Sequence, residues 1–290
     1  MRRILSLLAI IILLSCNRQN SVPGTRIITV SIAPFSYFVE EIGDGNFTVN
    51  VMVPPGSDPH IYEPYPGQIS KLRKSVAYIS NGYLGFEQAW LGRFYETNRS
   101  MKKLSLGEKI NKIEPPHKFE GKHSEPADPH YWVSPSCAMI MAASVKDLLC
   151  ELDPSKKEIY EANCRTLLSK ISEIDENARK LFSGLKSRTF MIYHPNLGYL
   201  ARDYGLTEIP VEYEGKEPPP SRLRELIDLA GKYNLKTIFV QREYDKKNAT
   251  EIAHEIGADV EVIDPLSENW LKETNDIITS LYRSFIKSIK

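Results

Sequence analysis

The 290-residue chain has no excess of charge of either sign and no long apolar run. Lysine and arginine together number 37, and so do aspartate and glutamate. A near-neutral chain without a basic stripe is not attracted to nucleic acid by its charge. The apolar stretch at residues 4–14 is too short to span a bilayer. These absences argue against a nucleic-acid-binding protein and against a transmembrane helix.

The short motifs of several enzyme classes are also missing. The sequence contains no His-Glu-x-x-His, no Gly-x-Ser-x-Gly and no phosphate-binding glycine loop. It has no Cys-x-x-Cys pair, so its cysteines do not indicate a zinc ribbon or a redox site. We therefore expect a protein that is not an enzyme, with a zinc-dependent hydrolase as the main alternative from another class.

The N-terminus has the features of an export signal. A basic start at residues 1–3 precedes the apolar residues 4–14, as in a signal peptide. Residues 13–16, LLSC, resemble the lipobox of bacterial lipoproteins, in which the cysteine becomes the lipidated first residue. A plain secretory leader with an incidental cysteine is the alternative. We predict export, lipidation of Cys16 and anchoring to a bacterial membrane on its periplasmic or cell-surface side.

Three cysteines lie beyond the predicted lipidation site, and an odd number leaves at least one thiol unpaired within the chain. Cys137 and Cys150 fall on one predicted helix about 20 Å apart, too far for a disulfide. Cys164 falls on an apolar helix face, which favours a buried thiol. A bridge between Cys150 and Cys164 is left open.

Apolar strand patterns alternate with helical patterns along the chain, which predicts an α/β fold with parallel sheets. Strands are expected at residues 26–32, 47–53, 76–80, 189–193, 207–211, 237–240 and 259–263. Helices are expected at residues 34–42, 66–74, 86–95, 135–152, 154–185, 197–204, 220–233, 246–256 and 268–290. Residues 109–129 are polar and proline-rich, and are expected to form a loop.

The helix expected at residues 154–185 divides the chain. Asp153 suits an N-cap and Pro154 the first turn. Apolar residues recur at alternating steps of four and three: Tyr160, Cys164, Leu167, Ile171, Ile174, Ala178, Leu181 and Leu185. This pattern predicts a helix roughly 45 Å long with one narrow apolar face. It fits either an amphipathic helix on a single core or a rigid connection between two domains.

Because an α/β half lies on each side of this helix, we favour the second interpretation. The expected divisions are a signal peptide, a lipid-anchored tether, a first lobe, a linking helix and a second lobe, at residues 1–15, 16–25, 26–153, 154–186 and 187–290. A single stiff helix should allow small tilts rather than wide hinge closure.

Three histidines and one aspartate stand out by their position. His60 and His194 follow predicted strands, His130 lies in an Asp-Pro-His-Tyr-Trp sequence, and Asp264 follows the last strand. Ligands of open parallel sheets bind beyond the carboxyl ends of the strands. Taken singly, each histidine could be an ordinary surface residue, and Asp264 could cap a turn. Together they form a ligand set suited to Zn²⁺, or to another first-row divalent ion.

At these residues the chain resembles the cluster A-I substrate-binding lipoproteins of zinc and manganese ABC transporters, the ZnuA/TroA type. The resemblance is carried by residues 55–64, 128–135, His194 with residues 198–200 and 204–206, and residues 263–266. It implies two α/β lobes bridged by one long helix, with a metal ion held in the cleft between them. It also implies the metal ligands, which are His60, His130, His194 and Asp264.

The resemblance further implies capture of Zn²⁺ and its delivery to an ABC transporter permease by a monomer. His194 occupies the position at which a histidine accompanies zinc, although Mn²⁺ is an alternative, as is a role as a surface adhesin. The chain departs from the family by a loop with only two histidines, His117 and His123, and by Pro195-Asn196 after His194. Glu243 is a candidate to contact a ligand rather than the metal itself.

Overall fold

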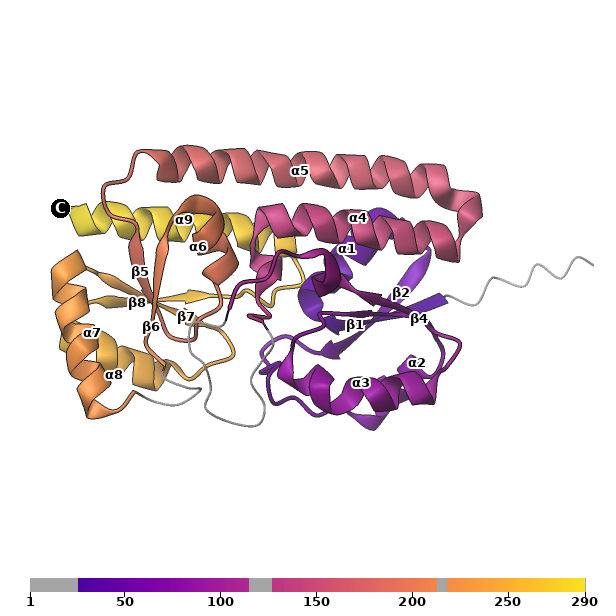
Figure 1. The fold of residues 1–290 in the computed structure, drawn as a ribbon, viewed down its shortest axis with the longest axis horizontal. Coiled ribbons are helices and arrows are strands. Elements are labelled where there is room, and N and C mark those ends of the chain that lie inside the picture. Colours follow the sequence, from indigo (N-terminus) through magenta and orange to yellow (C-terminus); the bar gives the residue numbers. More distant parts are fainter. Residues whose placement is uncertain (1–25, 115–126, 213–217, 290) are drawn as a thin grey trace, which may run out of the picture.

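The computed structural model describes residues 26–114, 127–212 and 218–289. The predicted leader and tether, Cys16, His117 and His123 lie outside these residues. Within them are two α/β lobes side by side, with one long helix running along both (Figure 1). None of the helices in this part of the chain is both long enough and apolar enough to cross a membrane. The predicted fold class is therefore confirmed.

Each lobe contains a four-stranded parallel sheet with the same strand order. In the first lobe the order is β2-β1-β3-β4, with bounds β1 Arg26–Ile32, β2 Phe47–Val53, β3 Ser75–Ser80 and β4 Lys102–Ser105. In the second lobe it is β6-β5-β7-β8, with bounds β5 Thr189–Ile192, β6 Thr207–Pro210, β7 Thr237–Gln241 and β8 Asp259–Ile263. The two sheets thus share one strand order along the chain.

Helices flank both sheets. In the first lobe they are α1 Ala33–Gly43, α2 Pro66–Leu72, α3 Gly85–Thr97 and α4 Pro135–Leu152, with short 3-10 helices η1 Leu106–Lys109 and η2 Tyr131–Val133. In the second lobe they are α6 Gly198–Tyr204, α7 Pro220–Tyr233, α8 Lys246–Ile256 and α9 Trp270–Ile289. The predicted strands and helices agree within two residues at each end, apart from the long helix. Strand β4 was not predicted, because its sequence KKLS is short and polar.

The long helix α5, Lys157–Ser183, begins later than expected. Pro154–Lys156 form a separate 3-10 turn, η3, so the prediction that Asp153 caps the α-helix is wrong. The buried residues of α5 are Tyr160, Cys164, Leu167, Ile171, Ile174, Ala178 and Phe182. Phe182 replaces the predicted Leu181 and Leu185, which are only partly buried. An α-helix drifts about 20° from a seven-residue repeat in each heptad, which shifts the buried face by the last turn.

The apolar core continues from one lobe into the other beneath α5. This helix packs on α1 and α4 of the first lobe and on α6 and α9 of the second. Near its end, the ring of Phe182 lies 5.6 Å from that of Tyr204 and 6.0 Å from that of Phe285. A second, smaller cluster lies against α7 and α8 and includes Leu226. The helix therefore runs along two lobes, as the second interpretation of its sequence expected, but it lies on a core that the lobes share.

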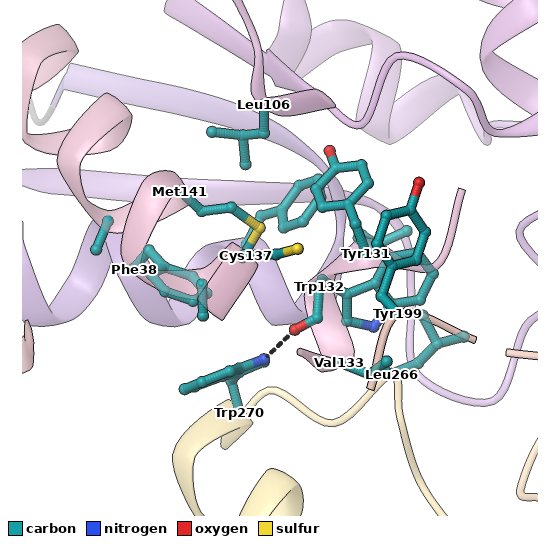
Figure 2. Close-up of a cluster of buried hydrophobic side chains, with 14 of the residues drawn as sticks. Phe38, Leu106, Tyr131, Trp132, Val133, Cys137, Met141, Tyr199, Leu266 and Trp270 are labelled. Atoms are coloured by element: carbon teal, nitrogen blue, oxygen red, sulfur yellow. Dashed lines mark hydrogen bonds between the residues drawn. The ribbon is translucent and has the colours of Figure 1, made fainter. Parts of the chain in front are cut away.

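Trp132 and Trp270 join the two lobes through hydrogen bonds and apolar packing (Figure 2). The indole N–H of Trp132 donates to the Pro265 carbonyl at 2.8 Å, and that of Trp270 donates to the Trp132 carbonyl at 2.6 Å. Both side chains are buried. Asp203 on α6 adds a third connection, because its carboxylate accepts a hydrogen bond of 2.5 Å from Ser134. The lobes thus meet through ordered polar contacts as well as apolar packing.

Cys137, Cys150 and Cys164 are free thiols in the structure. Cys164 is buried, as its place on the apolar face predicted. Its thiol lies 3.7 Å from the carbonyl of Ala142 on α4.

Candidate metal centre

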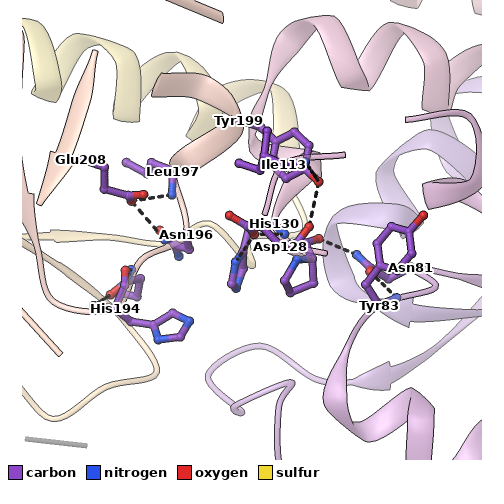
Figure 3. Close-up of polar contacts among 12 residues, drawn as sticks. Asn81, Tyr83, Ile113, Asp128, His130, His194, Asn196, Leu197, Tyr199 and Glu208 are labelled. Carbon is purple, nitrogen blue, oxygen red and sulfur yellow. Dashed lines mark hydrogen bonds and ion pairs between the residues drawn. The ribbon is translucent and has the colours of Figure 1, made fainter. Parts of the chain in front are cut away.

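Three histidines from different parts of the chain form one group, and Figure 3 shows two of them, His130 of the first lobe and His194 of the second. His60 follows β2, His130 precedes η2 and His194 follows β5. Their ring centroids are 5.3, 5.0 and 5.2 Å apart for the pairs 60–130, 60–194 and 130–194. One nitrogen from each ring lies within 4.8 Å of the others. The sequence predicted this convergence, and the spacing suits a single metal ion.

The two histidines of the first lobe lie in separate turns that have the same Asp-Pro-His sequence. In each, an aspartate two residues earlier accepts the backbone N–H of the histidine at 2.8 Å: Asp58 for His60 and Asp128 for His130. A proline between them fixes one backbone angle, and aspartate side chains favour such turns. The repeated Asp-Pro-His sequence therefore fixes the backbone of both histidines through contacts within the first lobe.

Asp128 also orients the ring of His130. Its Oδ1 lies 2.8 Å from Nδ1 of the histidine, and both side chains are buried. A proton held on Nδ1 by this carboxylate leaves the Nε2 lone pair for a metal, the usual arrangement behind a metal-binding histidine. Sequence reasoning missed this role of Asp128, although the Asp-Pro-His repeat was a signal for it.

His194 is oriented in the same way from the second lobe. Its Nδ1 lies 2.6 Å from Oε2 of the buried Glu212, and its Nε2 is buried without a hydrogen-bond partner. Tyr244 stacks on the ring at 5.0 Å. Burial lowers the pKa of His194, the charges of His60 and His130 add to this, and the Glu212 hydrogen bond opposes it. The ring is therefore neutral at neutral pH, as metal binding requires.

A buried glutamine holds the backbone of His194. Gln241, the last residue of β7, accepts the His194 N–H at 3.3 Å and donates to its carbonyl at 2.5 Å. The side chain of Gln241 is fully buried, so the two hydrogen bonds do not compete with water. The turn that begins at His194 is thus fixed on both sides of the residue.

Two carboxylates near the histidines have an oxygen without a hydrogen-bond partner. Asp264 binds Arg242 through Oδ2 at 3.0 Å, while its Oδ1 is buried and unpartnered. Glu243 has a buried, unpartnered Oε2, and burial raises its pKa to about 7, with the charges of Asp264 and Asp58 adding to the rise. Neither belongs to the group of ligand atoms that the three histidines form. The role of Asp264 as a metal ligand stays a prediction. So does the role of Glu243 as a residue that contacts a ligand.

The model of one protein family matches residues 28–289, and that family is described as the periplasmic zinc-uptake complex component A, ZnuA. The chain belongs to this family. A crystal structure of ZnuA superposes with a TM-score of 0.83 at 37% identity, covering 90% of this chain and 99% of the other. A deletion mutant of ZnuA with zinc bound gives a TM-score of 0.82, also at 37% identity, covering 90% and 98%.

Curated relatives in this family are more distant in sequence. The zinc-binding lipoprotein AdcA of Streptococcus pneumoniae is 25% identical over 276 residues, which are 91% of this chain and 54% of AdcA. The high-affinity zinc uptake system protein ZnuA of Bacillus subtilis is 28% identical over 262 residues, 86% of this chain and 81% of its relative. The chain spans about half the length of the streptococcal proteins. Both names describe zinc binding or uptake rather than an enzyme activity.

We expect this ZnuA-family protein, freed of metal, to lose stability as the pH rises from about 6.5 to 9. Burial raises the pKa of Glu87 to about 7 and that of Glu208 to about 8, from an ordinary 4.5. The folded state therefore keeps protons that the unfolded chain has released, and this advantage is lost as the pH passes each raised pKa. His194, with its lowered pKa, acts in the opposite sense but only below about 6.5.

Urea unfolding in the presence of a chelator, at pH 6.5 and at pH 9, measures this loss. In a Glu208→Gln variant the decrease should be smaller, because the amide does not titrate. An unfolding free energy that stayed level or increased over this range in the unmodified protein would contradict the prediction.

Proposed function

We propose that the protein captures Zn²⁺ outside the cytoplasmic membrane and delivers it to an ABC transporter permease. One observation carries the proposal: three imidazoles from two lobes place ligand nitrogens within 4.8 Å of one another. Carboxylates already hold Nδ1 of His130 and His194, so their metal-binding lone pairs point into the group. The zinc-related names of the family and its relatives support the same function.

We assign His60, His130 and His194 as three ligands and Asp264 as the fourth. The unpartnered Oδ1 of Asp264 supports its assignment, because a buried carboxylate oxygen without a donor is costly unless a cation compensates it. Four protein ligands close the coordination sphere of Zn²⁺. A closed site suits binding and release better than hydrolysis, which needs an open position for water.

The proposal includes the place of action. A lipid on Cys16 would hold the protein at the membrane, and residues 16–25 would act as a tether to the folded lobes. A tether of this length leaves the site free to meet a permease in the same membrane. We expect a monomer to be sufficient, because both lobes that contribute ligands belong to one chain.

Zinc should outcompete manganese when both are offered in equal amounts. Neutral imidazole ligands favour Zn²⁺, whereas Mn²⁺ prefers sites rich in carboxylate, carbonyl and water oxygens. Metal analysis of protein refolded with equimolar Zn²⁺ and Mn²⁺ tests this, and we expect bound zinc in strong excess, near one ion per chain. An excess of manganese would overturn the choice of metal. Steady turnover of a peptide or ester substrate would instead favour a zinc hydrolase.

A further inference from the structure

Glu208 on β6 binds the backbone between the metal centre and α6. Its Oε1 accepts the N–H of Asn196 at 3.2 Å and that of Leu197 at 2.9 Å (Figure 3). Leu197 precedes the first residue of α6 and offers no side-chain cap of its own. Glu208 therefore satisfies two backbone donors that the local sequence leaves open. One of them, Asn196, lies two residues after His194.

The start of α6 also lies against the first lobe. The Tyr199 hydroxyl donates to the Asp128 carbonyl at 2.9 Å. A Cβ on Gly198 would lie 3.0 Å from Oδ2 of Asp128 and 3.6 Å from Oε2 of Glu208, so the two carboxylates approach the same point on α6. Asp128 is the residue that orients His130. Contacts at one end of α6 thus connect the histidines of both lobes.

We propose that Glu208 is a positioning residue for zinc, which fixes the start of α6 and thereby the spacing between His194 and His130. This inference rests on the proposed function. Ligand nitrogens must approach Zn²⁺ to about 2.0–2.1 Å, so small displacements of one lobe's histidine matter. Glu208 touches no ligand, and its effect passes through the backbone of Asn196 and Leu197.

The protonation state of the Glu208 side chain determines which substitution resembles it most. Burial raises its pKa to about 8, the charge of Asp128 adds to the rise, and the two N–H groups oppose it. At pH 7 the side chain is thus largely the neutral acid, whose carbonyl oxygen accepts both hydrogen bonds. Glutamine offers the same carbonyl oxygen without a charge. Alanine offers none and leaves both N–H groups without this partner.

The experiment compares Glu208→Ala, Glu208→Gln and the control Leu226→Ala, a fully buried residue of the same lobe on α7 that is not one of the candidate ligands. Zinc affinity is measured by competition with a chromophoric chelator, below the unfolding transition of every variant. We expect Glu208→Ala to weaken affinity about 10-fold, the lower end of the cost of losing a residue that contacts a ligand, because Glu208 acts through the backbone alone. Glu208→Gln should stay within about threefold of the unmodified protein.

Two further readouts separate positioning from general destabilisation. The visible spectrum of bound Co²⁺ reports ligand geometry, and it should change in Glu208→Ala but not in Leu226→Ala. The control should unfold at a lower temperature while its zinc affinity stays unchanged. An unaltered affinity and spectrum in Glu208→Ala would overturn the inference, and so would an equal loss of affinity in Leu226→Ala.

If Glu208→Ala does not fold, Gly198→Ala tests the same contact from the other side. The added methyl would press on Asp128 and on Ile113, at 3.0 and 2.9 Å, and should also weaken zinc binding. Unchanged affinity in that variant would overturn the inference. If the unmodified protein itself bound no zinc, the proposed function would fail and this inference with it. Normal binding by the unmodified protein and by all variants would overturn only the role of Glu208.

Discussion

Replacing His194 with alanine should weaken zinc binding by more than about 100-fold while leaving the protein folded. Loss of a residue that merely orients a ligand costs about 10–100-fold in metal affinity, so loss of a ligand should cost more. The substitution removes a neutral imidazole whose Nε2 has no other partner, so few contacts within the protein are lost at that atom. Glu212 loses its hydrogen-bond partner, which should lower the unfolding free energy by about 1–3 kcal/mol.

Isothermal titration with Zn²⁺, together with the circular dichroism spectrum of each variant, measures both effects. His254→Ala is the matched control, because His254 is an exposed histidine on α8. Its affinity should equal that of the unmodified protein. Unchanged affinity in His194→Ala would show that zinc binds elsewhere and would remove the basis for the assigned ligands.

Replacing Trp270 with alanine should lower the unfolding free energy by about 3–5 kcal/mol, the usual cost of truncating a buried tryptophan. The side chain is 2% exposed, and its ring lies 5.3 Å from that of Phe38 and 6.4 Å from that of Tyr37, both in the first lobe. It also donates to the Trp132 carbonyl. The substitution therefore removes apolar packing between the lobes and leaves a buried carbonyl without its donor.

Urea unfolding of the metal-free protein measures the change in unfolding free energy. Two further variants separate the loss of the hydrogen bond from the loss of buried apolar packing. Trp270→Phe keeps an aromatic ring but removes the N–H, so it should cost about 1–3 kcal/mol. Trp90→Ala, on α3 and only partly buried, should cost less than Trp270→Ala. A loss below about 1 kcal/mol in Trp270→Ala would contradict the view that this residue fastens the lobes.

The helices, the strands and the convergence of the histidines could be predicted from the sequence, because they depend on local patterns and on a general rule for parallel sheets. A strand such as β1 is rich in isoleucine and valine, and a helix such as α4 repeats its apolar residues every three or four positions. The rule that ligands gather at the carboxyl ends of parallel strands brought His60 and His194 together. Strand β4 was missed because its edge position needs little apolar surface.

The partners of the histidines could not be predicted in the same way. Glu212 lies 18 residues after His194, and the pairing of β5 with β6 is what brings them together. Gln241 reaches the same histidine from β7, a further 29 residues along the chain, through another strand pairing. No period or spacing in the sequence marks either residue. Asp128 differs, because its turn is local and its motif occurs twice.

The core that continues between the lobes means that the molecule cannot be divided at the long helix into two usable halves. A fragment ending after α4 would expose the surface on which α5 and Trp270 lie, and the second half would expose the opposite surface. Each would resemble a subunit separated from an obligate dimer. The two lobes, although alike in strand order, should therefore be expressed and engineered as one folding unit. Helix α5 is a main reason, because it packs on both lobes.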